Sequence, residues 1–210
     1  MSQYFSVHPD QPQPRLIRQT AEIMRSGGLV AFPTDSAYAL GGPLGDASLL
    51  ERIRRIRGVD DRHHFTLMCR DLSEIATYAR VDNSQFRLLK ATTPGPYTFI
   101  LEGTKELPRR LLHPKRKTIG LRVPAHPVVS ALLDELNEPI LTSTLMLPGD
   151  VLPLSDPEEI CERLGKQLDL VIEAGFCGPD ATTVIDLTSG APVLVRAGCG
   201  DLAPFGLEQD

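Results

Sequence analysis

One stretch of the chain, residues 27–40, constrains its fold more than any other. Gly27 and Gly28 are typical of a helix end, and the apolar run 29–32 that follows has the length of a short buried strand. Pro33 has no N–H to donate to a sheet, so it ends that strand. The stretch therefore predicts a helix that leads directly into a buried strand of an α/β sheet.

Four polar side chains follow this strand directly. They are Thr34, Asp35, Ser36 and Tyr38. In open α/β sheets, ligands bind at strand ends of this kind, which makes the four residues candidate binding groups. A strand followed by an ordinary Asx or Ser/Thr turn explains the same pattern without a ligand. Spacing alone leaves both interpretations open.

Helix and strand patterns alternate along the rest of the chain. Asp46 and Asp156 are typical helix N-caps, and Gly58 is a typical helix stop. Helices are predicted over residues 15–26, 47–57, 72–78, 84–91, 127–136 and from 156 onwards. Strands are predicted over 65–69, 97–101, 118–123, 140–143, 168–172, 182–187 and 192–196. About seven strands and about six helices predict a single α/β domain over residues 1–210, with a twisted mixed sheet flanked by helices and a core at about 12–200.

The composition is that of an ordinary soluble domain. The 210 residues are 41% hydrophobic and 23% charged. No apolar run approaches the roughly 18 residues that span a bilayer, and the N-terminus has no secretion signal, so we expect a cytoplasmic protein with no membrane partner. The cysteines are scattered without a C-x-x-C pair, which predicts free thiols and no structural metal. They are Cys69, Cys161, Cys177 and Cys199.

Charge is distributed unevenly over the chain. Residues 1–149 hold 19 basic and 15 acidic residues, a net of +4, whereas residues 150–210 hold 3 and 12, a net of −9. Two segments are strongly basic: 51–57 has four arginines and one glutamate, and 105–117 has six basic residues against Glu106. Each segment is either a solvated surface or a local attraction for phosphates, since salt screens charge beyond about 8–10 Å.

Familiar nucleotide and hydrolase motifs are absent from the sequence. There is no G-x-G-x-x-G after a strand, no G-x-x-x-x-G-K-[ST], no H-E-x-x-H and no G-x-S-x-G. A Rossmann site, a P-loop, a zinc protease and an α/β-hydrolase are therefore not supported. If the chain binds ATP, side-chain cations must hold the phosphates, and arginine does this well.

The polar stretch also carries a family resemblance. Residues 33–40 resemble the Pro-Thr-Asp-Thr-x-Tyr-Gly-Leu signature of the YrdC-like family, which includes the L-threonylcarbamoyl-AMP synthases. Further motifs resemble the family in the same order, at residues 93–98, 120–124, 126–127, 182–186 and 195–198. The runs 64–72 and 143–149 are most similar to the YciO-like branch. The resemblance implies the YrdC/RibB-type α/β fold.

The resemblance also implies a reaction and its residues. The synthases use ATP, with Mg²⁺, to transfer an adenylyl group to threonylcarbamate for tRNA modification, and so the implied ligands are a nucleotide and a small amino-acid-like substrate. The implied substrate-binding residues are Thr34, Asp35, Tyr38 and Arg122. The implied nucleotide-binding residues are Arg57, Thr144, Thr183 and Arg196. No residue is assigned a catalytic role.

Two motifs depart from the synthase pattern. Arg57 and Val59 stand where synthases have Lys-x-Arg, and Thr144 and Met146 stand where they have Ser-x-Asn. Valine and methionine cannot replace a guanidinium and an amide. At roughly 1.5–3 kcal/mol for each lost contact, nucleotide binding weakens by about 10²–10⁴-fold unless other side chains compensate. The candidates for compensation are Arg54, Arg55, Arg62 and Arg70.

A second hypothesis is binding of double-stranded RNA or tRNA without catalysis. The resemblance implies a positively charged RNA face, and the two basic segments supply candidates for it. The candidate RNA-binding residues are Arg52, Arg54, Arg55, Lys115, Arg116 and Lys117. A scaffold with no catalytic role is a third possibility. The residues His63, His64 and Asp186 have either a phosphate or metal role or a purely structural one.

Overall fold

The protein, described by a computed structural model over residues 2–60 and 62–208, contains one large sheet flanked by helices. Its strands are β1 (Gln3–Ser6), β2 (Val30–Phe32), β3 (Ala39–Pro43), β4 (Thr66–Met68), β5 (Tyr97–Glu102), β6 (Thr118–Arg122), β7 (Ile140–Thr144), β8 (Leu170–Glu173), β9 (Thr183–Asp186) and β10 (Val193–Arg196). Its helices are α1 (Pro14–Arg25), α2 (Ala47–Arg57), α3 (Leu72–Tyr78), α4 (Asn83–Thr92), α5 (Pro127–Leu136) and α6 (Pro157–Leu164), with 3-10 turns η1 (Arg109–Leu111) and η2 (Ala203–Phe205). The predicted α/β fold is confirmed.

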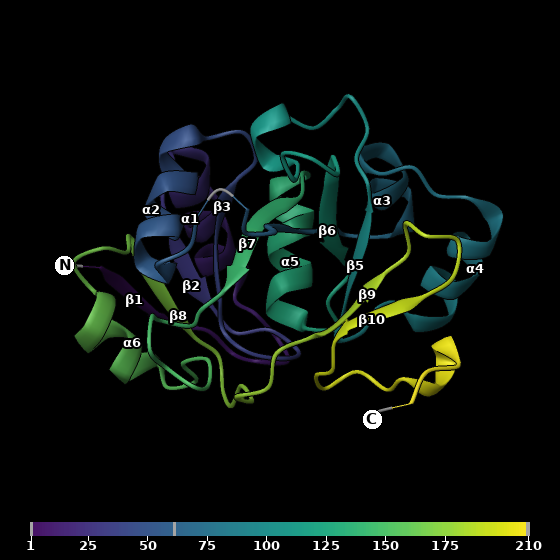
Figure 1. Ribbon diagram of the computed structural model, residues 1–210. Helices are drawn as coiled ribbons and strands as arrows, with labels where there is room; N and C mark the ends of the chain where they lie inside the picture. The colour runs from purple at the N-terminus through teal and green to yellow at the C-terminus, as the bar shows by residue number, and fades with distance from the viewer. Residues whose placement is uncertain (1, 61, 209–210) are drawn as a thin grey trace.

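The strand order brings distant parts of the chain together. In space the strands lie in the order β1-β8-β2-β3-β7-β4-β6-β5-β9-β10 (Figure 1). Strand pairs β1–β8, β2–β8, β4–β6 and β5–β9 are parallel, and the other pairs are antiparallel. The sheet is therefore mixed, and its centre joins strands from both halves of the sequence.

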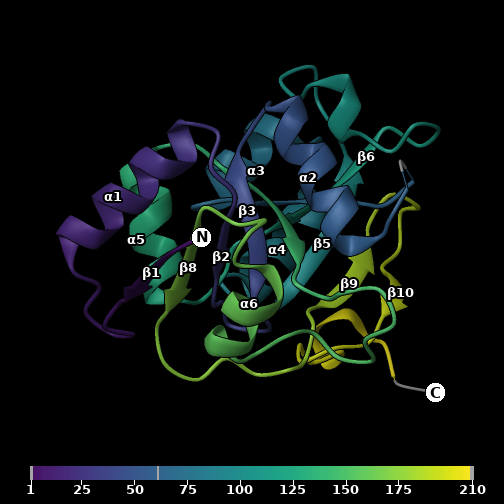
Figure 2. The same ribbon diagram turned by 90° about the vertical axis from the view of Figure 1, so that its left-hand side faces the viewer.

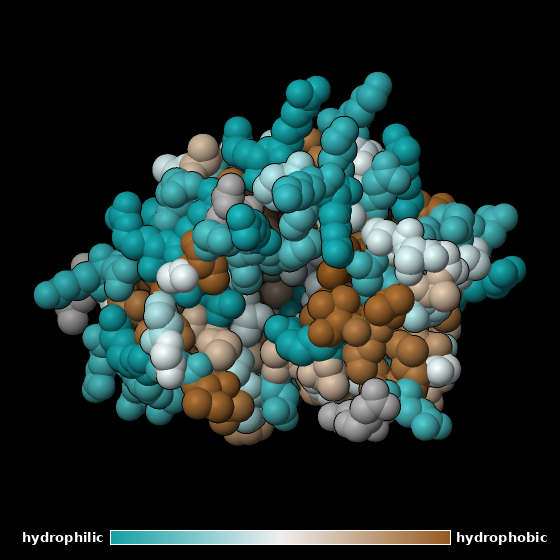
Figure 3. All heavy atoms as spheres, in the orientation of Figure 1, coloured by the Kyte–Doolittle hydropathy of each residue, from teal (hydrophilic) through white to brown (hydrophobic). Residues whose placement is uncertain are grey.

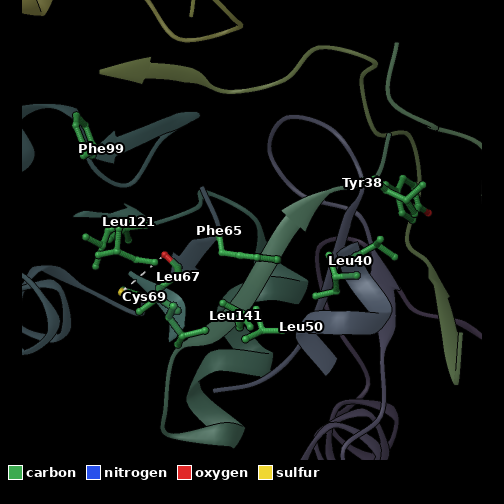
Figure 4. Close-up of a cluster of buried hydrophobic side chains, with 14 of the residues drawn as sticks. Tyr38, Leu40, Leu50, Phe65, Leu67, Cys69, Phe99, Leu121 and Leu141 are labelled. Carbon is green, nitrogen blue, oxygen red and sulfur yellow. Dashed lines mark hydrogen bonds between the residues drawn. The ribbon is translucent and has the colours of Figure 1, made fainter. Parts of the chain in front are cut away.

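The short strand β2 shows how the sheet separates two hydrophobic layers. Val30 and Phe32 belong to a cluster that includes residues of α1 and α5, whereas Ala31 belongs to a cluster that includes residues of α2 and α6. Successive strand residues point to opposite faces, so both faces of a fully buried strand must be apolar. Figure 2 shows α1 and α5 together on one side of the strands and α2 on the other. Figure 4 shows the second cluster, around Phe65 and Leu141.

Local sequence signals set the helix ends where they were predicted. The Asp46 carboxylate accepts hydrogen bonds from the N–H groups of Ser48 and Leu49, which caps α2, and Gly58 ends α2 in a left-handed conformation with φ 61°. Asp82 and Gln85 form a reciprocal capping box at α4. Side-chain caps satisfy N–H groups that the helix itself leaves unpaired.

Two strands were missing from the prediction. β1 is a largely exposed edge strand with no period-two pattern, and β3 has the sequence Ala-Leu-Gly-Gly-Pro, whose residues are depleted in strands. The packing around β3 explains its glycines. A Cβ at Gly41 would lie 2.8 Å from the Phe32 ring and 2.9 Å from a methyl group of Ile140. Tertiary contacts therefore override the low strand propensity of this segment.

Candidate functional site

A cleft of about 470 Å³ opens over the middle of the sheet. Its floor includes one row of residues that the strand register places side by side, Thr142, Thr66, Gly120 and Ile100 from β7, β4, β6 and β5. A Cβ at Gly120 would lie 2.9 Å from Thr66 Oγ1 and 3.1 Å from the Phe65 carbonyl oxygen. The missing side chain at Gly120 therefore keeps the floor open. Figure 3 shows the hollow, with polar side chains around much of its rim and apolar ones over β9 and β10.

Four arginines line this cleft. They are Arg57 at the end of α2, Arg62 in the following loop, Arg122 on β6 and Arg196 on β10. Among the described residues, no aspartate or glutamate lines the cleft with them. Burial lowers the pKa of Arg57 and of Arg196, and the positive charge of Arg196 lowers that of Arg57 further. A cleft of this composition favours a ligand with several negative charges.

Arg122 is almost fully buried and has its own counterion. Its Nη2 donates to the Asp35 carboxylate and, at 3.3 Å, to Ser36 Oγ. The other Asp35 carboxylate oxygen accepts a 2.8 Å hydrogen bond from the backbone N–H of Ala125. Asp35 therefore neutralises and holds the guanidinium, and the excess positive charge of the cleft comes from Arg57, Arg62 and Arg196.

Two buried donors on the cleft arginines lack partners within the described part of the chain. They are the Nε atoms of Arg57 and Arg122. Arg57 does donate from Nη1 to the Met146 carbonyl oxygen at 2.8 Å, and Arg196 donates from Nη2 to the Thr182 carbonyl oxygen at 2.9 Å. A buried polar group without a partner costs about 1–3 kcal/mol. The cleft therefore has unmet hydrogen-bonding capacity as well as charge.

Five of the eight residues assigned to substrate or nucleotide line the cleft. They are Tyr38, Arg122, Arg57, Thr144 and Arg196. Tyr38 is fully buried and its hydroxyl donates to the Ile172 carbonyl oxygen at 3.0 Å, so its hydroxyl is already used. Burial also raises the Tyr38 pKa.

The other three residues lie outside the lining. The Thr34 hydroxyl donates to the Ala37 carbonyl oxygen at 2.7 Å and so braces the turn behind the cleft, next to Asp35. The Thr183 hydroxyl donates to the Gly200 carbonyl oxygen at 2.7 Å and accepts from the N–H groups of Gly198 and Gly200. We correct the expected placement of Thr34 and Thr183 beside a ligand, because both hydroxyls are committed to turns. Their roles in binding stay predictions.

Two further side chains in the cleft come from positions that sequence reasoning left open or missed. His63, in the loop before β4, places Nε2 3.2 Å from Oγ of Ser143 on β7. Burial, followed by the charge of Arg57, lowers the pKa of His63 to about 4. The Arg-His-His run before a strand was a usable signal for His63, whereas a serine inside a strand gives none.

Of the four arginines considered as compensation for Val59, the structure brings only Arg62 to the cleft lining. Arg54 donates to Glu51 at 2.6 Å and lies over the Phe65 ring at 5.6 Å, and Arg55 is on the exposed side of α2. Arg70 lines a separate cavity of about 500 Å³ beside His126. Sequence could not separate these residues, because their positions depend on how the loop after α2 folds back.

The candidate RNA-binding residues lie on α2 and on the loop after η1. Arg52 is paired with Asp169 at 2.7 Å, Arg54 with Glu51, and Arg116 with Asp186 at 3.7 Å. Arg55, Lys115 and Lys117 are exposed, and no ion pair of theirs appears within the described residues. Intramolecular pairs therefore reduce the positive charge available to a phosphate backbone.

Metal and membrane features are few in the part of the chain that the structure covers. No cluster of three or more His, Cys, Asp or Glu side chains suitable for a metal ion occurs within residues 2–60 and 62–208. The same ranges contain no helix long and apolar enough to cross a bilayer. The four cysteines are free thiols.

The fold and the cleft define a class of α/β protein in which a long mixed sheet carries an arginine-lined cleft. Residues 22–198 match the model of the Sua5/YciO/YrdC family, which is described as telomere recombination, and the chain belongs to this family. It is 60% identical over 205 residues to YciO of Escherichia coli (strain K12), covering 98% of this chain and 100% of that protein. The crystal structure of E. coli YciO matches with a TM-score of 0.95 over 98% of this chain and 100% of that one.

Threonylcarbamoyl-AMP synthases are more distant relatives. That of Halorhodospira halophila is 29% identical over 185 residues, which is 87% of this chain and 96% of that protein. The structure of Pyrococcus abyssi Sua5 complexed with L-threonine matches with a TM-score of 0.85 and 27% identity, over 93% of this chain and 57% of that chain. The family and the YciO resemblance predicted from the motifs are thus confirmed.

Proposed function

We propose that the cleft binds the phosphates of ATP and that the chain carries out adenylyl transfer to threonylcarbamate, as a reaction weaker than that of the synthases. The observation that carries the proposal is the convergence of Arg57, Arg62 and Arg196 in one cleft without a lining carboxylate. In this reaction the carbamate oxygen attacks the α-phosphorus and pyrophosphate leaves. The enzyme's contribution is to position the reactants and stabilise the developing charge.

The residues fit ATP better than they fit a resident metal. Guanidinium groups bind phosphate oxygens through charge-assisted hydrogen bonds. Mg²⁺ is usually held by one or two carboxylates together with phosphates. The nearest candidate, Asp35, is occupied by Arg122 and the Ala125 N–H. Mg²⁺ therefore belongs to this proposal as part of the nucleotide substrate, and no step depends on a protein-held ion.

The relatives support an amino-acid-like second substrate. L-Threonine is the ligand in the structure of P. abyssi Sua5, a protein of the same family. In this chain, Arg122 and Ser36 lie at one end of the cleft, where a carboxylate has a buried guanidinium for a partner. The proposed role of this end is to bind the threonine-derived part of the substrate.

Pyrophosphate release tests the proposal directly. The protein is supplied with ATP, Mg²⁺, threonine and bicarbonate, and pyrophosphate is measured with each component omitted in turn. We expect release that requires all of the substrates and that falls in Arg196→Ala but not in Arg87→Ala, an exposed arginine on α4. No release above buffer at saturating ATP overturns the catalytic proposal.

Binding of duplex RNA without catalysis is the second candidate. It is favoured by the exposed Arg55, Lys115 and Lys117 on α2 and the neighbouring basic loop. Phosphate-directed binding weakens steeply with salt, so a duplex titrated at about 50 and about 200 mM salt should lose affinity by orders of magnitude. An absent or salt-insensitive signal contradicts this candidate.

A further inference from the structure

His63 and Ser143 form a hydrogen-bonded pair inside the cleft that the arginine cluster does not explain. His63 Nε2 lies 3.2 Å from Ser143 Oγ. The His63 ring stands edge-on to Phe65, with centroids 5.4 Å apart, and its backbone N–H donates to the Asp60 carbonyl oxygen at 3.2 Å. Packing and hydrogen bonds therefore fix the orientation of the imidazole in the cleft.

The imidazole is neutral at neutral pH. Its pKa is lowered from 6.5 to about 4 by burial and by the nearby charges of Arg57, His64 and Arg54, while Asp60 acts in the opposite direction. Arg62 lines the same cleft and adds to the positive surroundings. A neutral imidazole has one N–H donor and one acceptor nitrogen.

Counting hydrogens shows what the pair offers to a ligand. The neutral imidazole and the serine hydroxyl hold two polar hydrogens between them, and their mutual hydrogen bond uses one. The second is available to another acceptor whichever tautomer is present. In a cleft lined by Arg57 and Arg196, the fitting acceptor is an anionic oxygen. The pair adds a donor there without adding another positive charge.

We propose that His63 and Ser143 act together as a neutral hydrogen-bond donor to a phosphate oxygen of a nucleoside polyphosphate. The inference rests on the proposed function, since the same cleft must bind that polyphosphate. The pair supplies the kind of neutral donor that Met146 cannot, although from a different strand position. Its role is to position the phosphate and not to react with it.

The test is calorimetric titration of ATP, and separately of inorganic tripolyphosphate, into wild type, His63→Ala, Ser143→Ala and the double variant. A hydrogen bond to a charged oxygen is worth about tenfold or more in affinity, so each single variant should bind about tenfold more weakly. The double variant should lose little more than the weaker single, because both changes break one unit. Tripolyphosphate should show the same losses, since it has no base or ribose.

Three further variants complete the experiment. His8→Ala and Ser130→Ala, both exposed and outside the cleft lining, should bind as wild type does. His63→Gln, which keeps a neutral donor, should recover part of the lost affinity, whereas a merely structural role predicts no such rescue. Thermal melting of each variant checks folding, and Ser143→Ala with His63→Gln decides the matter where His63→Ala does not fold.

The outcomes separate the two proposals. If wild type binds neither ATP nor tripolyphosphate, both proposals fail. If wild type binds both, Arg196→Ala binds weakly, and His63→Ala and Ser143→Ala bind within about twofold of wild type, this inference fails and the proposed function stands.

Discussion

Arg57 donates a 2.8 Å hydrogen bond to the backbone carbonyl oxygen of Met146. This contact joins the two segments in which the chain departs from the synthase motifs, one at the end of α2 and the other after β7. The acceptor is a main-chain atom, so the contact does not depend on the side chain at position 146. The cleft therefore keeps its shape at Met146 although the methionine offers no polar group to a ligand.

Restoring the missing groups should strengthen ATP binding. Met146→Asn adds an amide and Val59→Arg adds a guanidinium, and each new contact to a phosphate is worth about 1.5–3 kcal/mol, or about 10–150-fold in affinity. We expect the double variant to bind ATP at least about tenfold more tightly in calorimetry. Leu152→Asn, at an exposed loop position, is the control and should change nothing. Unchanged affinity in the double variant would show that these positions do not face the phosphates.

The Asp35–Arg122 pair should be critical for stability. Asp35→Asn removes the only carboxylate that the described residues place on a nearly buried guanidinium, and leaving such a charge uncompensated costs about 3–5 kcal/mol. Urea unfolding of the variant should show this loss. Adding Arg122→Met should recover part of it, because the orphaned charge is removed, while Asp10→Asn on the surface should be neutral. Wild-type stability in Asp35→Asn would refute the structural role of the pair.

Gly120 should tolerate no side chain. Its replacement by alanine places Cβ 2.9 Å from Thr66 Oγ1 and 3.1 Å from the Phe65 carbonyl oxygen. Overpacking of this kind costs about 1–3 kcal/mol, and the methyl group also intrudes on the cleft floor. We expect a lower melting temperature and weaker ATP binding. Gly178→Ala is the matched control, since its Cβ would meet nothing closer than 3.5 Å, and an equal effect of both changes would contradict the prediction.

Acid should destabilise the protein partly through His63. Its pKa is lowered from 6.5 to about 4 on folding, so protonation favours the unfolded chain. The stability due to neutral burial is present above the unfolded pKa of about 6.5 and is lost as pH falls towards 4. The loss amounts to about 2–3 kcal/mol for a shift of this size. It should be measurable as a steeper decline in unfolding free energy between pH 7 and 4.5 for wild type than for His63→Gln, and parallel declines would refute it.

Much of the architecture could be predicted because its signals are local. Asp46, Asp82 and Asp156 each cap the helix that their position in the sequence predicts, and Gly58 ends α2. β1 and β3 were missed because their propensity is low and their stability comes from neighbours in the sheet. The arginines of the cleft were predicted as a set only through family motifs, since they lie on α2, β6 and β10.

The sequence by itself determined the elements, the caps and the family, because these depend on residues close together in the chain. Only the tertiary structure decided which polar groups share a cavity: it brought His63 to Ser143 across 80 positions and selected Arg62 over Arg70. It also showed that the hydroxyls of Thr34 and Thr183 are used by their own turns. Hydrogen-bond partners and burial depend on which strands pair, and strand pairing joins segments that no local pattern connects.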